Sequence, residues 1–245
     1  MDATYDRIGG DYAATRRPDP RIAAAVERAL GNADIVLNVG AGTGAYEPED
    51  RRTVAVEPSI TMIRQRRSRG SALAVQGRAE ALPFADRRFD AAMALLTIHH
   101  WTDPVRGLQD MRRVTRGRIV LLTFDPASRG TWLTDYLPGL IALDAAQLPA
   151  MSFYGEYLGK VDILPVPIPD DCTDGFLYAF WRRPSAYLDP ARRAGSSSFW
   201  ALPNVDAAMW RLEDDLKSGV WTRRYGHLLK EEVFDAGYRL VVTAR

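Results

Sequence analysis

Cysteine is nearly absent from this chain: Cys172 is the only one in 245 residues. A single cysteine excludes an internal disulfide, and nothing near it has the spacing of a metal site. We therefore predict no metal centre, and we interpret Cys172 as a small buried or half-buried residue.

An excess of charge of one sign and long hydrophobic stretches are also lacking. The formal net charge is +1, whereas a protein that holds nucleic acid by its backbone presents a strongly basic face. Apolar runs such as AAMALL (91–96) fall far short of the ~20 residues that span a bilayer. The first residues, MDATYDRIGG, have no apolar core of a signal peptide. We expect a cytoplasmic protein with no nucleic-acid or membrane partner.

Five short apolar segments begin at Asp34, with helix signals between most of them. They are DIVLNVG (34–40), TVAVE (53–57), ALAVQG (72–77), FDAAMALL (89–96) and RIVLLTF (118–124). The runs are continuous rather than alternating, as in parallel strands that are buried on both faces. Strands that alternate with helices indicate a doubly wound sheet. The sequence therefore predicts an α/β fold with a doubly wound, mostly parallel sheet.

The second half of the chain, after Asp125, has a different character. Two more strands are predicted, in KVDILPVPI (160–168) and YRLVVTA (238–244). Helices rich in aromatic residues are predicted in TWLTDYLPGLIAL (131–143), TDGFLYAFWRRP (173–184) and VDAAMWRLEDDLKSG (205–219). We expect a single domain over residues 1–245, with an N-terminal lid and helix (1–33), a core (34–125), a helical cap with one strand (126–235) and a final strand (236–245).

Three glycines, Gly40, Gly42 and Gly44, directly follow the first strand. Glycine allows a sharp turn and lets a ligand approach the backbone, whose N–H groups can form the floor of a nucleotide site. Glu57 ends the next strand, where a carboxylate can accept both hydroxyl groups of a ribose. These features fit a dinucleotide as well as S-adenosylmethionine (SAM), because the string from Gly40 to Ala45 also satisfies a relaxed G-x-G-x-x-A pattern.

Four segments together are more specific than the glycines. They are VLNVGAGTG (36–44), VAVEPSITMIRQR (54–66), GRAEALPFADRRFDAAMALLTIHHWTDP (77–104) and LQDMRRVTRGRIVLLTF (108–124). In this order and spacing the chain, from about Asp34 to Asp125, resembles the class I SAM-dependent methyltransferases, specifically small-molecule enzymes similar to the ubiquinone/menaquinone C-methyltransferases. The resemblance implies a Rossmann-like seven-stranded sheet with a helical lid. It also implies SAM as cofactor and methyl transfer to an O, N or C atom of a small organic metabolite, for example in specialised metabolism.

The resemblance also implies a cofactor site. The glycine loop lies under the methionine part of SAM, Glu57 holds the ribose, and the first turns, with Tyr5, close over the cofactor. The residues implied to bind the cofactor are Tyr12, Arg16, Asn38, Gly40, Ala41, Gly42, Gly44, Glu57, Pro58, Met62, Ala79, Glu80 and Leu95.

Two residues depart from the family's pattern. Asn38 stands where the family commonly has an acid (LDVGCGTG), and Arg78 stands where it often has Asp. We expect Asn38 to fix the loop by hydrogen bonding. Since Arg78 has no acceptor, the adenine amino group must be met by backbone, Glu80 or water. Cofactor affinity is the property that these changes affect.

Methyl transfer needs a general base only if the acceptor must lose a proton. His100 and His99 follow the fourth strand and are the catalytic candidates, with His100 favoured; the alternative is that one caps local backbone and the other is a wall of the pocket. The acceptor is expected under aromatic residues of the second half, namely Trp132, Tyr136, Phe153, Tyr154, Tyr157 and Trp200.

Two other functions stay open on sequence alone. An NAD(P)-dependent oxidoreductase would use the same glycine turn and acid, but no recognisable set of catalytic Lys, Tyr or Cys residues follows the fourth or fifth strand. A protein that keeps the SAM fold for binding or a non-methylating reaction is compatible with Asn38 and Arg78.

Overall fold

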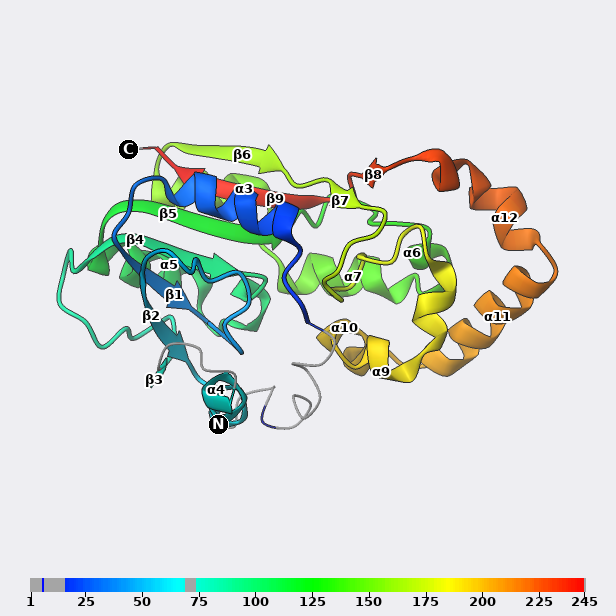
Figure 1. The fold of residues 1–245 in the computed structure, drawn as a ribbon, viewed down its shortest axis with the longest axis horizontal. Helices are drawn as coiled ribbons and strands as arrows, with labels where there is room; N and C mark the ends of the chain where they lie inside the picture. The colour runs from blue at the N-terminus through cyan, green and yellow to red at the C-terminus, as the bar shows by residue number, and fades with distance from the viewer. Residues whose placement is uncertain (1–5, 7–15, 69–73, 245) are drawn as a thin grey trace.

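A computed structural model describes residues 6, 16–68 and 74–244 (Figure 1). Its centre is a seven-stranded sheet in the order β3-β2-β1-β4-β5-β9-β6. The strands are β1 (Ile35–Val39), β2 (Arg52–Glu57), β3 (Ala74–Gln76), β4 (Phe89–Leu95), β5 (Thr115–Phe124), β6 (Val161–Pro165) and β9 (Tyr238–Thr243). The first five are parallel, and β9 runs antiparallel to both β5 and β6. The predicted doubly wound, mostly parallel sheet is confirmed.

The continuous apolar runs are explained by burial on both faces of the sheet. Val36 and Met93 belong to one core cluster, while their chain neighbours Leu37 and Ala92 belong to the other. Successive side chains of a strand point to opposite faces, so a strand that is covered on both faces is apolar at nearly every position. The two clusters therefore define two helical layers around the sheet.

One layer contains α3 (Pro20–Leu30), which crosses the sheet in Figure 1 and buries Ile22, Val26 and Leu30. The Asp19 carboxylate accepts a hydrogen bond from the Arg21 N–H and so caps this helix. The other layer contains α5 (Pro104–Val114) and α8 (Met151–Leu158). The short helix α4 (Ile60–Ser68) follows β2 and packs beside β2 and β3.

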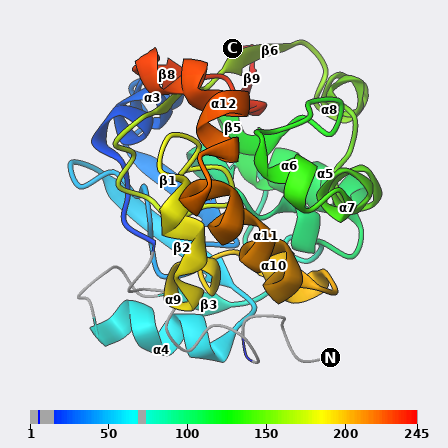
Figure 2. The ribbon, with the colours of Figure 1, turned by 90° about the vertical axis from the view of Figure 1, so that its right-hand side faces the viewer.

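The cap lies beyond one end of the sheet (Figures 1 and 2). Its elements are α6 (Leu133–Tyr136), α7 (Gly139–Gln147), η2 (Pro184–Leu188), α9 (Pro190–Arg193), α10 (Ser197–Ala201), α11 (Val205–Lys217), α12 (Val220–Tyr225) and η3 (Gly226–Lys230), with the β7–β8 pair (Ile168–Pro169 and Val233–Phe234). The Trp132 ring makes T-shaped contacts with Tyr136, Tyr187 and Trp221, with centroids 5.3–5.9 Å apart. Its indole N–H donates to the Trp181 carbonyl at 2.6 Å. The aromatic residues of the cap thus pack on one another and belong to the same core cluster as one face of the sheet.

The helix predicted over residues 173–184 is wrong, because the structure has consecutive turns there. All side chains from Phe176 to Trp181 are buried, whereas a helix at the surface keeps one face exposed. The Trp181 indole donates to the Ile168 carbonyl at 3.0 Å, which ties the segment to β7. The helix predicted over residues 131–143 is also interrupted, at Leu137 and Pro138, between α6 and α7.

No helix within residues 16–68 and 74–244 combines the length and the apolar character that crossing a bilayer requires.

Candidate active site

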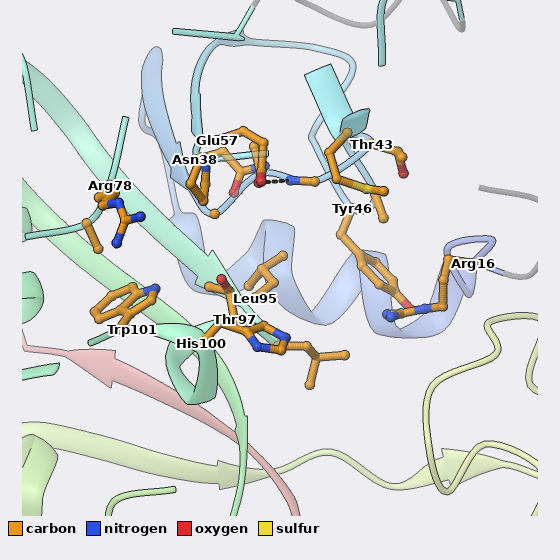
Figure 3. Close-up of a pocket in the computed structure, with 18 of the residues that line it drawn as sticks. Arg16, Asn38, Thr43, Tyr46, Glu57, Arg78, Leu95, Thr97, His100 and Trp101 are labelled. Atoms are coloured by element: carbon orange, nitrogen blue, oxygen red, sulfur yellow. Dashed lines mark hydrogen bonds between the residues drawn. The ribbon is translucent and has the colours of Figure 1, made fainter. Parts of the chain in front are cut away.

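A cavity of about 210 Å³ opens where β1, β2 and β4 end (Figure 3). Ligands of open α/β sheets bind at the carboxyl ends of the strands, where the strand order reverses. Of the predicted cofactor residues, the cavity is lined by Arg16, Asn38, Gly40, Ala41, Gly42, Glu57, Pro58, Met62, Ala79, Glu80 and Leu95. Gly44 closes the turn instead, with its N–H on the Ala41 carbonyl at 2.9 Å. Tyr5 and Tyr12 lie outside the described residues.

The glycine loop needs its glycines for two different reasons. A Cβ at Gly40 would lie 2.2 Å from the Thr97 hydroxyl oxygen, so this side chain, two residues after β4, occupies that space. A Cβ at Gly42 would meet nothing within 4 Å, because it would project into open space. Both have positive φ, 67° and 52°. Gly40 is thus required by packing as well as by backbone conformation, Gly42 by backbone conformation alone, and the open space at Gly42 can take a ligand.

Glu57 is held rigidly at the end of β2. It is only 4% exposed. One carboxylate oxygen accepts the N–H of Gly42 at 2.8 Å (Figure 3), and the other accepts the N–H of Ser59 at 2.8 Å. Burial raises the pKa of Glu57, although the two backbone donors oppose the shift. Each oxygen keeps a second lone pair, so the carboxylate can accept two ribose hydroxyls while it holds the glycine loop.

Asn38 donates its side-chain N–H to Glu47 Oε1 at 2.8 Å. The other oxygen of Glu47 pairs with Arg66 at 2.5 Å, and the Arg66 side chain is fully buried. Arg66 is one of the basic residues in the last turn of α4. The structure buries this cation as the partner of Glu47, so the carboxylate near the glycine loop comes from position 47.

Arg78 and Trp101 lie at one end of the cavity (Figure 3), and Glu80 and Thr102 also line it. Glu80 Oε1 accepts the Thr102 N–H at 2.7 Å and hydroxyl at 2.9 Å, and a further bond from the next residue. These bonds hold the pKa of Glu80 below its ordinary value, against the effect of burial, which raises it. Sequence reasoning missed Trp101. The residue that could have pointed to it is Gly107, a glycine inside α5. A Cβ at Gly107 would lie 2.5 Å from the Trp101 indole ring, so glycine is needed there for the close packing.

Arg16 and Tyr46 lie toward the opposite end (Figure 3). Arg16 forms a two-pronged ion pair with buried Asp174 of the cap, at 2.6 and 3.1 Å. The Tyr46 hydroxyl donates to the same carboxylate at 2.8 Å. Tyr46 and Leu96 have positive φ, 62° and 53°, a strain that collects at functional sites.

A second cavity, of about 70 Å³, adjoins the first and shares Arg16 and Leu96 with it. The two adjacent histidines divide between them: His100 lines the first cavity and His99 the second. The second cavity also has a wall of four aromatic residues, Phe124, Phe176, Tyr178 and Tyr238.

Both histidines are neutral at physiological pH. Burial lowers the pKa of His100 to about 4. Burial, with His100 and Arg16 nearby, lowers the pKa of His99 well below its ordinary value. A neutral imidazole offers a lone pair, but a low pKa makes it a weak base.

The aromatic residues expected around the acceptor line neither of these cavities. Trp132 and Tyr136 are buried in the cap. Phe153, Tyr154 and Tyr157 of α8 pack with the layer on the other side of the sheet. Trp200 is 57% exposed. The apolar bulk of these residues is evident from their identity, but sequence alone does not distinguish an internal contact from a cavity wall.

Among residues 6, 16–68 and 74–244, no three His, Cys, Asp or Glu side chains come together as a metal site. The chemistry of the first cavity is that of a nucleoside site: a buried carboxylate with free lone pairs, a bare loop and an aromatic end.

Comparison with known proteins agrees with this chemistry. A family described as "Methyltransferase domain" matches residues 37–121. A crystal structure from Anabaena variabilis, described as a methyltransferase from an antibiotic biosynthesis pathway, is 34% identical with a TM-score of 0.86, covering 94% of this chain and 99% of that one. The demethylmenaquinone methyltransferase of Mycobacterium sp. strain KMS is 35% identical over 113 residues, which are 44% of this chain and 49% of that protein. That of Renibacterium salmoninarum is 34% identical over 108 residues, 41% and 46% of the two chains. The chain spans about half the length of these curated relatives.

The fold and the site are those of an α/β protein with a SAM-binding site at the carboxyl ends of its parallel strands. The chain belongs to the class I SAM-dependent methyltransferases and is similar to the quinone methyltransferases among them. The family's cofactor is SAM, and the first cavity fits it, since Glu57 offers acceptors for the ribose and Gly42 leaves the loop open.

Proposed function

We propose that this protein transfers the methyl group of SAM to an O, N or C atom of a small organic metabolite. The observation that carries the proposal is the shared boundary of the two cavities at Arg16 and Leu96. A methyl donor in the first cavity and an acceptor in the second would meet there. We call the two spaces the cofactor cavity and the acceptor cavity.

The chain's residues contribute mainly by positioning. Bound SAM supplies a methyl group activated by its sulfonium, and the displacement leaves the electrons of the broken S–C bond on sulfur. Glu57 and the glycine loop would hold the ribose and the methionine part of bound SAM, and Trp101 and Met62 would flank its adenine. Holding an acceptor at near-attack distance in a site with little water accounts for most of the rate in such a reaction.

His99 is the residue that we propose to take a proton from the acceptor, because it lines the acceptor cavity, whereas His100 lines the cofactor cavity. The sequence favoured His100; the geometry favours His99. Its low pKa suits an acceptor that loses its proton late or that needs no base at all.

The acceptor is proposed to come from specialised metabolism. The Anabaena variabilis protein, described as part of an antibiotic biosynthesis pathway, supports this choice because it covers nearly the whole chain. We further propose that the chain forms one domain and acts in the cytoplasm. We also propose that it has no nucleic-acid partner, which the formal net charge of +1 supports.

Thermal-shift measurements test the proposal. SAM and S-adenosylhomocysteine should raise the melting temperature, whereas NAD⁺ and NADP⁺ should not, since only a ligand that binds the native state stabilises it. Stabilisation by NAD(P)⁺ alone would favour an oxidoreductase. Release of S-adenosylhomocysteine on addition of candidate acceptors then separates a methyltransferase from a protein with a non-methylating role.

A further inference from the structure

The acceptor cavity contains a carboxylate that the methyl-transfer chemistry does not use. Asp144 of α7 is half-buried and lines this cavity. The Tyr178 hydroxyl donates to its Oδ2 at 3.3 Å. In the described part of the chain, no basic nitrogen forms an ion pair with Asp144, and no charged group contributes to its pKa shift.

The cations and potential cations of the same cavity are committed elsewhere. Arg16 is paired in two-pronged fashion with Asp174, whose side chain is fully buried. His99 is neutral because burial lowers its pKa. The charge that the acceptor cavity presents to a ligand is therefore the negative charge of Asp144.

The aromatic wall of the acceptor cavity is one connected cluster. Phe124 lies 5.3 Å from Tyr178 and 5.4 Å from Tyr238, and Phe176 lies 4.8 Å from Tyr238, between ring centroids. All four rings are at most 6% exposed. Aromatic faces attract cations, and a desolvated carboxylate is costly unless an opposite charge pairs with it. Rings and acid together favour a ligand that has both an apolar body and a positive charge.

We propose that the methyl acceptor carries a protonated amine, which pairs with Asp144 while the acceptor's apolar part packs on the four rings. This inference rests on the proposed function. A protonated amine has no lone pair and cannot attack the sulfonium, so the amine is a recognition group. The atom that receives the methyl group lies elsewhere on the acceptor, toward Leu96 at the boundary of the two cavities, with His99 in the wall of the acceptor cavity.

The pH dependence of amine binding follows from the ionisation of Asp144. The other titratable groups that line the acceptor cavity are Tyr178, Tyr238, His99 and Arg16, and Tyr178 donates the hydrogen bond to Asp144. Burial raises the pKa of Asp144 to about 6, against the lowering effect of the Tyr178 hydrogen bond. Amine binding should be strongest above this pH and should weaken as the carboxylate is protonated below it.

Three probes that share one ring separate charge from shape: tyramine (cationic), 4-ethylphenol (neutral) and 3-(4-hydroxyphenyl)propanoate (anionic). Their dissociation constants are measured by NMR titration of the full chain saturated with S-adenosylhomocysteine, at pH 7.5 and pH 5. We expect tyramine to bind about tenfold more tightly than the other two at pH 7.5, and to lose most of this preference at pH 5.

The variant Asp144→Asn should abolish the preference for tyramine and leave the affinity for S-adenosylhomocysteine unchanged. Asp162→Asn is the matched control, because Asp162 is exposed on β6, and it should behave like the unaltered protein. If Asp144→Asn does not fold, the inference is tested by comparing the preference of the unaltered protein for tyramine at pH 7.5 and pH 5.

Equal binding of the three probes, no measurable tyramine binding, or a preference that survives in Asp144→Asn would overturn the inference. Affinity for S-adenosylhomocysteine is measured separately. Intact cofactor binding without an amine preference refutes only the amine, whereas absent cofactor binding refutes the proposed function itself.

Discussion

Replacing Asn38 by Asp restores the acid that the family commonly has before the glycine loop, and the structure predicts that this change is harmful. The Asn38 amide donates to Glu47 Oε1 at 2.8 Å. Asn38→Asp would put a second carboxylate where that donor stood, beside a Glu47 that already pairs with Arg66. An Asp at position 38, the residue that the family commonly has, would therefore repel the carboxylate that Glu47 already supplies here.

The size of the effect follows from that contact. A hydrogen bond to a charged group contributes about 1.5–3 kcal/mol. Two unit charges about 3 Å apart repel by up to roughly 6 kcal/mol at an effective dielectric constant of about 20, and protonation or rotation of one carboxyl relieves part of this. We expect a net loss of about 2–4 kcal/mol, which for a chain of this size lowers the melting temperature by roughly 5–15 °C.

The loss of folding stability in Asn38→Asp should depend on pH. Like-charge repulsion raises the pKa of one of the two carboxyls in the folded variant. A group whose folded-state pKa is raised contributes stability that is present below its unfolded pKa and lost as the pH rises. The difference from the unaltered protein should therefore be small near pH 4 and largest near pH 8.

Melting temperature and calorimetric affinity for SAM are the two measurements. Asn32→Asp, the same change at an exposed position, is the control and should alter neither. Exchanging donor and acceptor in the double variant Asn38→Asp with Glu47→Gln should recover part of the loss. An Asn38→Asp protein as stable as the unaltered one, with equal or better affinity for SAM, would refute the role given to Glu47.

Three further predictions concern other parts of the site. Gly42→Ala should lower stability by only about 1 kcal/mol, the cost of placing a side chain at positive φ, yet weaken SAM binding by about tenfold or more in calorimetry, because its Cβ would enter the ligand space. Asp174→Asn should destabilise the protein by about 3–5 kcal/mol in urea titration, since it removes the carboxylate charge that pairs with buried Arg16. A loss of stability no larger than that of breaking an exposed ion pair would contradict this. Because the pKa of Glu57 is raised in the folded state, its ionisation opposes folding above the unfolded pKa, so the stability of Glu57→Gln relative to the unaltered protein should improve from pH 4 to pH 8; a flat profile would argue against the buried charge.

The sheet could be predicted because its signal is local. The runs from Ile35 to Val39 and from Phe89 to Leu95 are apolar at nearly every position, as burial on both faces requires. The glycine turn and Glu57 follow strands directly, and the carboxyl ends of parallel strands meet at one edge of the sheet. Strand order and local sequence together therefore indicate the cofactor cavity.

The rest of the site depends on contacts between distant residues. Arg66 lies 19 positions after Glu47, and Arg16 lies 158 positions before Asp174, so neither pair leaves a periodic pattern. Tyr178 lies in a segment whose composition favours a helix, but packing on every side holds it in turns. The acceptor cavity was missed because its wall combines β5, β9 and the cap, which only tertiary packing brings together.

Calorimetric titration of S-adenosylhomocysteine into the unaltered protein and into Glu57→Gln tests the central claim most directly. The account predicts binding to the unaltered protein and an affinity about ten- to a hundredfold lower in the variant, which loses a charged acceptor for the ribose hydroxyls. Equal affinities in two equally folded proteins would contradict it.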